Sequence, residues 1–407
     1  TVPLVSPTTL GTGGWGRGKW GKGTWGTPRT GIDIMKALPD AYSLDNWGED
    51  LLVQTSADQR LLRWSPATPS TVLTAVSGAP AGRQFVVTPE RFVMMFGIAS
   101  DPRAFGWCDQ EVITDWNFAS TTNKAGSYTV EPASPLVAAI STRDGVLLWT
   151  SKKLYLSRFV GLPAVYSLEE ISDGTVPFSP GSVVTSGGAV LWASEGGFWR
   201  FDGGGVAPLA CPIWAWIAED IDIGAARERA VMCRVDTRGE VWWFFPQMGQ
   251  TENTRAAVYS VREGWWSQAR IGRSAGAGDS FTAYPTFARG TEAFRHEQAG
   301  GFAGEELPWA ETFPLALNDG ADMMTILRML PDVEGDATTL DFTVFSRTDR
   351  ALKGAERSQT RRVRSNGWVD FRATGRDFRL RIATTTAPVP MFTLGQSLLE
   401  VAKRGKR

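Results

Sequence analysis

The chain has 407 residues, of which 43% are hydrophobic and 11% aromatic, which is enough for two or three packed units and excludes disorder throughout. With 18 Trp, 44 Gly and 23 Pro, the composition favours many short strands joined by tight turns over long helices. Cys108, Cys211 and Cys233 form no Cys-x-x-Cys pattern, so we expect core thiols and neither a disulfide framework nor a zinc site. The formal net charge is −1, but residues 341–407 hold 15 Lys and Arg against six Asp and Glu. Such a split can join copies of a chain head to tail, or bind an anion at one end.

No apolar run approaches the ~18 residues that a membrane-spanning helix needs. The first residues, TVPLVSPTTL, also lack the charged and then apolar order of a signal peptide. We therefore expect a soluble protein that is made in a reducing cytoplasm and does not insert into a membrane by itself.

Residues 1–36 are predicted to form an extended arm. Residues 11–26 repeat every five residues, and the repeats end in Trp15, Trp20 and Trp25. The repeat matches Gly-x-Gly-x-x-Gly three times, but no apolar strand precedes it, so we do not expect a dinucleotide site. If the arm is extended, its tryptophans lie about 16 Å apart at ~3.3 Å per residue. We interpret them as anchors to a neighbouring subunit, with packing on the same subunit as the alternative.

Residues 37–304 are predicted to form a β-propeller with five to seven blades. About six hairpin-bearing segments follow one another at intervals near 40 residues, which is the length of a four-stranded blade. The clearest aromatic hairpins are Leu51–Trp64, Gly145–Arg158, Gly187–Gly203 and Val241–Trp266. One helix is predicted over Pro212–Ile221, from an apolar stripe at helical spacing and a proline suited to the first turn.

Residues 305–395 are predicted to form a β-sandwich or barrel-like domain, followed by a basic tail at 396–407. Apolar and polar positions alternate along residues 340–344 and 378–382, and arginines occupy part of the polar face. We predict a basic docking surface made of Arg361, Arg362, Arg364, Arg379, Arg381, Lys403, Arg404, Lys406 and Arg407. Docking to an acidic face of a neighbouring subunit is favoured over contact with DNA phosphates, because no aromatic residues interleave with the tail.

The sequence contains no complete catalytic motif, which favours a protein that is not an enzyme. His296 is the only histidine and lies in no motif that would place it beside a nucleophile, so we predict no catalytic, cofactor-binding or metal-binding residues. Ser56-Ala-Asp58 begins a sialidase-like box, but Arg60 stands where that box has glycine. Paired carboxylates for glycoside hydrolysis come together only in space, so that alternative stays open.

Four stretches resemble, in the same order, segments of the tail nozzle proteins of short-tailed bacteriophages, also called tail-stabilisation proteins. They are Tyr42–Pro66 (YSLDNWGEDLLVQTSADQRLLRWSP), Trp107–Trp116 (WCDQEVITDW), Gly187–Gly203 (GGAVLWASEGGFWRFDG) and Glu240–Trp266 (EVWWFFPQ to EGWW). Each stretch alone is an aromatic hairpin or loop, so the specificity lies in their succession. Cys108 stands where the family usually has serine.

The resemblance implies a structural virion protein. Such a nozzle is a homo-hexameric ring at the distal end of a short tail, which retains the packaged genome and lets duplex DNA pass at ejection. The implied partners are tail adaptor or connector proteins and tail fibres, and the implied location is the virion tail after synthesis in the host cytoplasm. Residues 37–340 hold 36 Asp and Glu against 22 Lys and Arg, which suits passage of DNA without tight binding. The alternatives are a glycan-binding propeller that recognises a host surface, and a propeller glycoside hydrolase.

Overall fold

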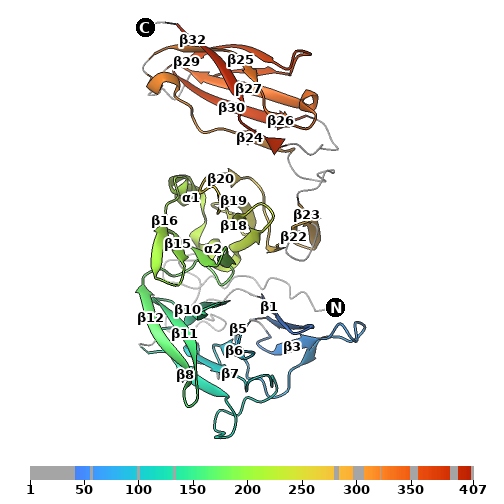
Figure 1. The fold of residues 1–407 in the computed structure, drawn as a ribbon, viewed down its shortest axis with the longest axis vertical. Helices are drawn as coiled ribbons and strands as arrows, with labels where there is room; N and C mark the ends of the chain where they lie inside the picture. The colour runs from blue at the N-terminus through green and yellow to red at the C-terminus, as the bar shows by residue number, and fades with distance from the viewer. Residues whose placement is uncertain are drawn as a thin grey trace, which may run out of the picture. The chain divides into compact units, whose positions relative to one another are not determined.

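The computed structural model describes residues 42–55, 58–98, 101–131, 134–278, 284–296, 307–320, 322–348, 356–385 and 393–404. The described chain is mainly β, as the composition predicts, and is built largely from four-stranded antiparallel sheets (Figure 1). It divides into two compact units, Thr1–Phe294 and Arg295–Arg407. The predicted arm at residues 1–36 lies outside the described residues.

Six antiparallel sheets make up the described part of the first unit, and each consists of strands that follow one another in the chain. The first three sheets contain β1 (Tyr42–Trp47), β2 (Asp50–Thr55), β3 (Leu61–Trp64) and β4 (Thr74–Ala75); β5 (Gln84–Val87), β6 (Val93–Phe96), β7 (Ala104–Trp107) and β8 (Gly126–Thr129); and β9 (Leu136–Thr142), β10 (Gly145–Thr150), β11 (Lys153–Gly161) and β12 (Val165–Asp173). The next three contain β13 (Val183–Ser186), β14 (Ala189–Ser194), β15 (Gly197–Phe201) and β16 (Val206–Leu209); β17 (Val231–Val235), β18 (Glu240–Pro246), β19 (Asn253–Ser260) and β20 (Trp266–Ala269); and β21 (Ala275–Ala277), β22 (Thr286–Arg289) and β23 (Glu292–Arg295).

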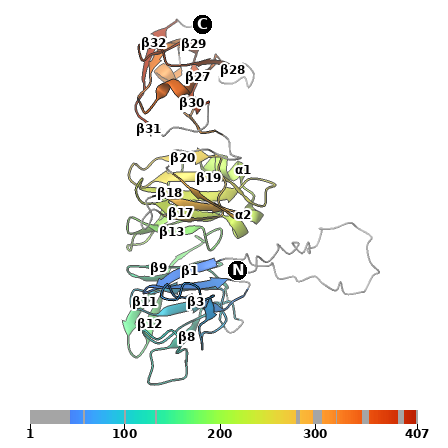
Figure 2. The same cartoon turned by 90° about the vertical axis from the view of Figure 1, so that its right-hand side faces the viewer.

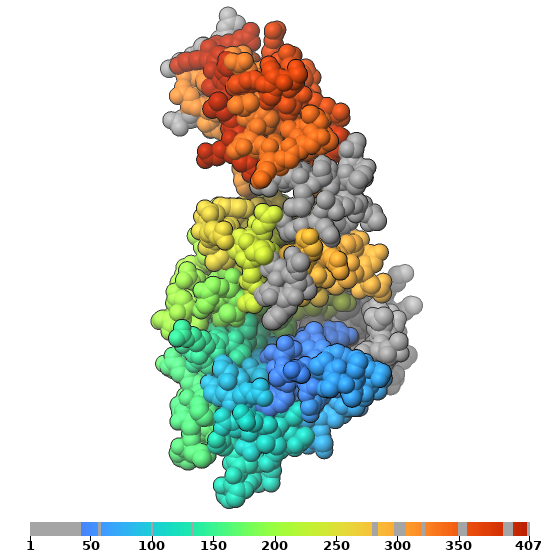
Figure 3. Space-filling model, turned by 45° about the vertical axis from the view of Figure 1, so that its right-hand side comes forward, coloured from blue at the N-terminus to red at the C-terminus, as the bar shows by residue number. Residues whose placement is uncertain are grey.

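Successive sheets of this unit lie side by side. The first strand of each sheet neighbours the first strand of the next: β1 lies beside β5, β5 beside β9, β9 beside β13, β13 beside β17, and β17 beside β21. Figure 1 shows this order as a progression of colour from blue through green to yellow, and Figure 3 shows the blue first sheet directly against the lighter blue second sheet. The arrangement is propeller-like.

Second strands are buried on both faces because their side chains alternate between two neighbouring sheets. On β10, Val146 and Leu148 pack in the cluster shared with the second sheet. Leu147 and Trp149 of the same strand pack in the cluster shared with the fourth sheet. A strand that is covered on both faces has an unbroken run of apolar residues in its sequence, instead of apolar residues that alternate with polar ones. This explains VMMF in β6, GVLLWT in β10, AVLWAS in β14 and VWWFF in β18.

The first sheet is covered less evenly than the sheets that follow it. On one face, Leu52 is fully buried in the cluster shared with the second sheet. On the other face, Leu44 lies opposite Val53 in the β1–β2 register and is 61% exposed. Only one face of this sheet therefore packs in a hydrophobic core that is shared with a neighbouring sheet.

The predicted hairpins are confirmed. The β14–β15 hairpin pairs Trp192 with Trp199, and the turn that precedes it uses Gly187 and Gly188 at φ of 60° and 82°. Two consecutive residues at positive φ define the tight turn that matches strand twist, and glycine adopts it without strain.

The predicted helix at Pro212–Ile221 is confirmed as α1 (Trp214–Asp220), and a second helix follows it as α2 (Ile223–Arg229). The carboxylate of Asp222 accepts a hydrogen bond from the backbone N–H of Ala225 at 3.0 Å and so caps α2. The sequence prediction missed α2 because its sequence IGAARER contains Gly224 and has one large apolar residue, so it shows no apolar stripe.

The second unit contains two larger sheets around one core (Figure 2). One sheet has the order β24 (Trp309–Glu311), β30 (Asp377–Thr384), β27 (Leu340–Arg347) and β28 (Glu356–Arg361); the other has the order β29 (Val369–Gly375), β25 (Met324–Leu330) and β32 (Leu398–Lys403). A small sheet pairs β26 (Val333–Glu334) with β31 (Thr393–Leu394), and two short 3₁₀ turns lie at Leu317–Gly320 and Ala337–Thr339. Along β27, Leu340, Phe342 and Val344 are buried while the residues between them are partly exposed, which is the alternation that the sequence predicts.

Candidate functional site

A hollow of about 480 Å³ lies where the first strands of three sheets meet in the first unit. It is open to solvent and is lined by Tyr42–Asp45 of β1, Gln84–Val87 of β5 and Ala139–Ser141 of β9. Each of these strands is the first of its sheet and has one edge without a ladder partner in that sheet. Backbone polar groups as well as side chains therefore face this space.

Asp45 is the one carboxylate among the residues that line the hollow. Its Oδ2 accepts a hydrogen bond from the backbone N–H of Val87 at 3.0 Å, and its Oδ1 accepts one from the N–H of Asn46 at 2.8 Å. Burial raises the pKa of Asp45, and these two hydrogen bonds partly oppose that rise. The side chain thus joins the first sheet to the second and holds a carboxyl group of altered acidity at the rim of the hollow.

Gln84 joins the second sheet to the third in the same way. Its Nε2 donates to the backbone oxygen of Ala139 at 2.9 Å, and its Oε1 accepts from the N–H of Ala139 at 3.1 Å. A side-chain amide with both ends bonded to one backbone residue acts like a short piece of β-ladder. The lining of the hollow is therefore held in one arrangement by Asp45 and Gln84.

The sequence analysis did not predict this site, although Asp45 lies inside one of the quoted stretches. A signal was present, because aspartate is depleted in strands and Asp45 interrupts the strand YSLDNW. Its partner Val87 lies 42 residues away, so no local motif identifies the contact. Chemically, one carboxyl group in an open hollow can bind a polar ligand or move a proton, whereas two-carboxylate hydrolysis needs a second acid.

Most tryptophans of the four family-like stretches are buried or partly buried, and Trp265 is the exposed exception. Trp192 and Trp243 are essentially inaccessible to solvent, and Trp47 and Trp107 are buried. The indole Nε1 of Trp192 donates to the backbone oxygen of Thr175 at 2.7 Å. The buried tryptophans therefore determine how the sheets pack. Their order along the chain is evidence for a fold and not for a ligand site.

The predicted intersubunit anchors Trp15, Trp20 and Trp25 lie outside the described residues, as do Lys406 and Arg407 of the predicted basic surface. The other members of that surface lie on the second unit, spread over both of its larger sheets and the loops between them.

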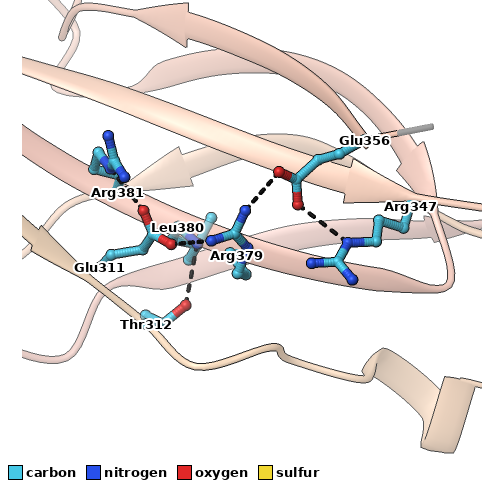
Figure 4. A network of polar contacts seen from close by, with 7 residues as sticks. All are labelled: Glu311, Thr312, Arg347, Glu356, Arg379, Leu380 and Arg381. Atoms are coloured by element: carbon cyan, nitrogen blue, oxygen red, sulfur yellow. Dashed lines mark hydrogen bonds and ion pairs between the residues drawn. The ribbon is translucent and has the colours of Figure 1, made fainter. Parts of the chain in front are cut away.

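Arg379 and Arg381 lie in a network of ion pairs on β30 (Figure 4). Glu311 on β24 bridges both arginines: it contacts Arg379, and its Oε2 accepts from Arg381 Nε at 2.6 Å. Glu356 on β28 accepts from Arg379 at 2.5 Å and from Arg347 at 3.2 Å. Burial of Glu356 would raise its pKa, but the hydrogen bonds from Arg379 and Arg347 outweigh it and lower the pKa.

Aromatic rings complete this face of the sheet. The guanidinium of Arg379 lies 4.8 Å from the ring centroid of Phe345, and that of Arg381 lies 4.6 Å from the centroid of Trp309. Arg379 and Arg381 thus already form ion pairs and ring contacts within their own unit. These ion pairs weaken the attraction of the two arginines for an anion outside the unit.

Three further members of the predicted basic surface are also paired. Arg362 contacts Asp341 at 2.8 Å, Arg364 contacts Asp370 at 2.6 Å, and Lys403 contacts Asp322 at 2.7 Å. Arg361 and Arg404 form no ion pair within the described ranges; Arg361 donates to the backbone oxygen of Thr360 at 2.9 Å. The structure therefore does not bring the predicted residues together as one cationic patch.

Among the residues that the structure describes, no group of three or more His, Cys, Asp and Glu residues is placed to hold a metal ion. The three cysteines are unpaired thiols, with Cys108 and Cys233 buried and Cys211 partly buried. Neither helix among these residues has the length and apolarity to cross a membrane.

No family model matches the chain, and no curated protein matches it. Among solved structures, it is similar to virginiamycin B lyase from Staphylococcus aureus, at 9% identity over 61% of this chain and 76% of that chain, with a TM-score of 0.40. It is also similar to a streptogramin B lyase, at 12% identity over 62% of this chain and 78% of that one, with a TM-score of 0.40. A luciferin-regenerating enzyme matches at 10% identity over 62% of this chain and 84% of that one, with a TM-score of 0.38. Because the TM-scores are so low, no activity of this chain follows from these likenesses.

One expectation from the sequence is corrected by this comparison. The sequence analysis predicted that the chain is not an enzyme, but the solved proteins to which it is similar are named as enzymes. That prediction rested on the absence of local catalytic motifs. In an array of sheets, the acids of a site meet only in space, so the absence of a local motif excludes nothing.

Proposed function

We propose that this chain is a structural subunit of a phage virion, the tail nozzle of a short-tailed bacteriophage. The observation that carries the proposal is the ordered succession of four family-like stretches, from Tyr42–Pro66 to Glu240–Trp266. They fall on four different sheets of the first unit, in chain order. A resemblance that recurs sheet by sheet is supported better than one confined to a single hairpin.

The proposal includes a more specific fold. We take the six sheets of the first unit as six blades of one propeller, and the two larger sheets of the second unit as a β-sandwich platform. Contacts between the first strands of successive sheets, and clusters shared by facing sheets, support the propeller. A core cluster formed by residues of both larger sheets supports the sandwich.

As a nozzle subunit, the chain would form a homo-hexameric ring with tail adaptor proteins and tail fibres as neighbours. It would retain the packaged genome and then allow duplex DNA to pass. The excess of acidic residues over residues 37–340 supports passage without tight binding, since each neutralised phosphate would add affinity through counterion release. The tryptophan arm would anchor each subunit to the next.

Electron microscopy of purified particles labelled with an antibody against this chain tests the proposal. We expect label at the distal end of the tail and sixfold rings in preparations of the purified chain. Particles without label, together with a purified chain that stays monomeric at all concentrations, would contradict it.

A second candidate is a propeller that binds or hydrolyses a glycan in the hollow of β1, β5 and β9. The open space of about 480 Å³, lined by the carboxyl group of Asp45 and by Tyr42 and Ser43, favours this candidate, because sugars are held by convergent polar groups. Calorimetric titration with host cell-wall glycans tests it. We expect binding by the natural chain and at least a tenfold loss in Asp45→Asn, roughly the effect of one charged hydrogen bond. Equal titrations with the two proteins would contradict this candidate.

A further inference from the structure

The basic side chains of the second unit fall into two groups that differ in whether a carboxylate neutralises them. Arg362, Arg364, Arg379 and Arg381 each contact an acidic partner within the unit. An arginine that is already paired attracts a further anion only weakly, because the two charges largely cancel at a distance. The predicted docking function must therefore rest on other arginines.

The second group includes Arg404 and three arginines called here the edge arginines, which are Arg357, Arg361 and Arg372. All three are exposed, and within the described ranges none of them forms an ion pair. Arg357 and Arg361 lie on β28, which is the end strand of its sheet, and Arg372 lies on β29, which is the end strand of the other. Arg357 and Arg372 were not among the residues predicted from the sequence.

Gln359 holds these two end strands together. Its Nε2 donates to the backbone oxygen of Arg372 at 3.0 Å, and its Oε1 accepts from the N–H of Arg372 at 3.1 Å. Arg357 and Arg361 stand two residues to either side of Gln359, so they share its face of β28 and lie about 13 Å apart along the strand. The three guanidinium groups are thus carried by two adjoining strands whose spacing is fixed by a side-chain clamp.

The first unit carries the opposite charge. Residues 1–294 hold 28 Asp and Glu against 25 Lys and Arg, and within them residues 37–294 hold 27 Asp and Glu against 20 Lys and Arg. Part of this excess gathers around α1 and α2, where six carboxylates accompany three arginines. The carboxylates are those of Glu195, Glu219, Asp220, Asp222, Glu228 and Glu252; the arginines are Arg227, Arg229 and Arg255.

Each of these three arginines pairs with one of the acids: Arg227 with Glu195, Arg229 with Glu252, and Arg255 with Asp220. Glu219 and Glu228 have no ion pair among the described residues. We call this region the α1–α2 surface, and its net charge makes it complementary to the edge arginines.

We propose that the edge arginines dock the second unit of one copy onto the α1–α2 surface of a second copy. The inference rests on the proposed ring, because a ring needs a head-to-tail contact between unlike surfaces of identical subunits. Guanidinium groups can hold carboxylates through two parallel N–H bonds, which gives direction as well as attraction. Such a contact weakens with added salt, since it lies at the surface.

Sedimentation velocity of the full chain over a range of concentrations, at ~0.05 M and ~0.3 M salt, tests this contact. The test variant is R357Q/R361Q, and the matched control R362Q/R364Q removes two charges from the same segment but from arginines that are already paired. We expect the dissociation constant of the assembly to rise about tenfold in the test variant and to change less than about threefold in the control. Equal effects in the two variants, or none in either, would overturn the inference.

Charge reversal identifies the partner surface. Glu219→Lys with Glu228→Lys should weaken assembly, and mixing that variant with R357E/R361E should restore heterotypic assembly. Absence of rescue would overturn the choice of the α1–α2 surface.

Duplex DNA is the other binding partner that exposed arginines could have. Fluorescence anisotropy with a short labelled duplex distinguishes it: loss of DNA binding in R357Q/R361Q, with assembly unchanged, would overturn the docking inference in favour of nucleic acid. If the natural chain assembles and labels the tail but R357Q/R361Q assembles equally well, only this inference fails. If the natural chain neither assembles nor labels the tail, the proposed function fails with it.

Discussion

Trp149 and Trp192 meet edge to face between the third and fourth sheets, with ring centroids 5.2 Å apart and an interplanar angle of 65°. Both side chains are fully buried, and they come from the second strands of adjacent sheets. The contact is therefore one of the points at which neighbouring sheets depend on each other.

Replacing Trp192 by alanine should lower the free energy of unfolding by about 3–5 kcal/mol, because it removes a large buried ring and leaves a cavity. The hydrogen bond from its Nε1 to Thr175 is lost as well. Urea denaturation followed by circular dichroism measures the change. The control Trp265→Ala removes a ring that is 48% exposed and should cost much less; similar costs for the two variants would contradict the packing described here.

Loss of the Asp45 proton should lower the free energy of unfolding as the pH rises. Burial raises its pKa above the ordinary value of 3.8, so in the folded chain it keeps its proton over a window in which the unfolded chain has lost it. Its contribution to stability is present below that window and is lost as pH rises through the folded pKa. Asp45→Asn should therefore gain stability relative to the natural chain as pH rises above the ordinary pKa of 3.8, as measured by urea denaturation at several pH values.

Asp222 supplies a control of opposite sign for the Asp45 experiment. The hydrogen bond from the backbone N–H of Ala225 lowers the pKa of Asp222, against the effect of burial. Its contribution is present above 3.8 and is lost as pH falls through the folded pKa. The cost of Asp222→Asn should thus shrink at acid pH. If the two variants depended on pH in the same direction, the assigned environment of Asp45 would be wrong.

Glu356 should stabilise the second unit through its two arginine partners. Because its pKa is lowered in the folded chain, Glu356→Gln should cost up to about 1 kcal/mol near neutral pH, and the cost should fade as pH drops below the ordinary value of 4.5. Added salt should reduce the cost too. Thermal unfolding measures it, and Glu334→Gln, at an exposed carboxylate of the same unit, is the matched control. An equal effect at Glu334 would argue against the network in Figure 4.

The three thiols should resist alkylation in the folded protein. Burial raises the pKa of Cys108 and of Cys233 to about 12 and that of Cys211 to about 11, so almost no thiolate is present at pH 8. Mass spectrometry after iodoacetamide treatment should find all three unmodified in buffer and all three modified in urea. Fast modification of Cys211 in buffer would show that its surroundings are more open than described.

The hairpins could be predicted from the sequence because their evidence is local. Gly187 and Gly188 mark a turn, and the apolar runs VV before it and AVLW after it mark strands, so no distant contact is needed to recognise them. The unbroken apolar run VLLW in β10 is also a local signal, since it indicates a strand covered on both faces.

The candidate site could not be predicted, because its contacts span the chain. Asp45 bonds to Val87, 42 residues away, and Arg379 pairs with Glu311, 68 residues away. Sequence spacing shows the alternation that puts Arg379 on a polar face, but it does not show that a carboxylate waits on the neighbouring strand. The ion pairs of Arg379 and Arg381 with Glu311 are therefore visible only in the folded unit.

Every interior sheet of the first unit shares side-chain clusters with the sheets on both sides, whereas Leu44 of β1 remains 61% exposed. Each shared cluster couples one sheet to the next, so neighbouring sheets stabilise each other. Amide hydrogens of β10 and β14 should accordingly exchange most slowly, and those of β1 should exchange first, by local opening and not by unfolding of the whole unit. The first sheet is thus the part of the unit that can open at the smallest free-energy cost to the rest.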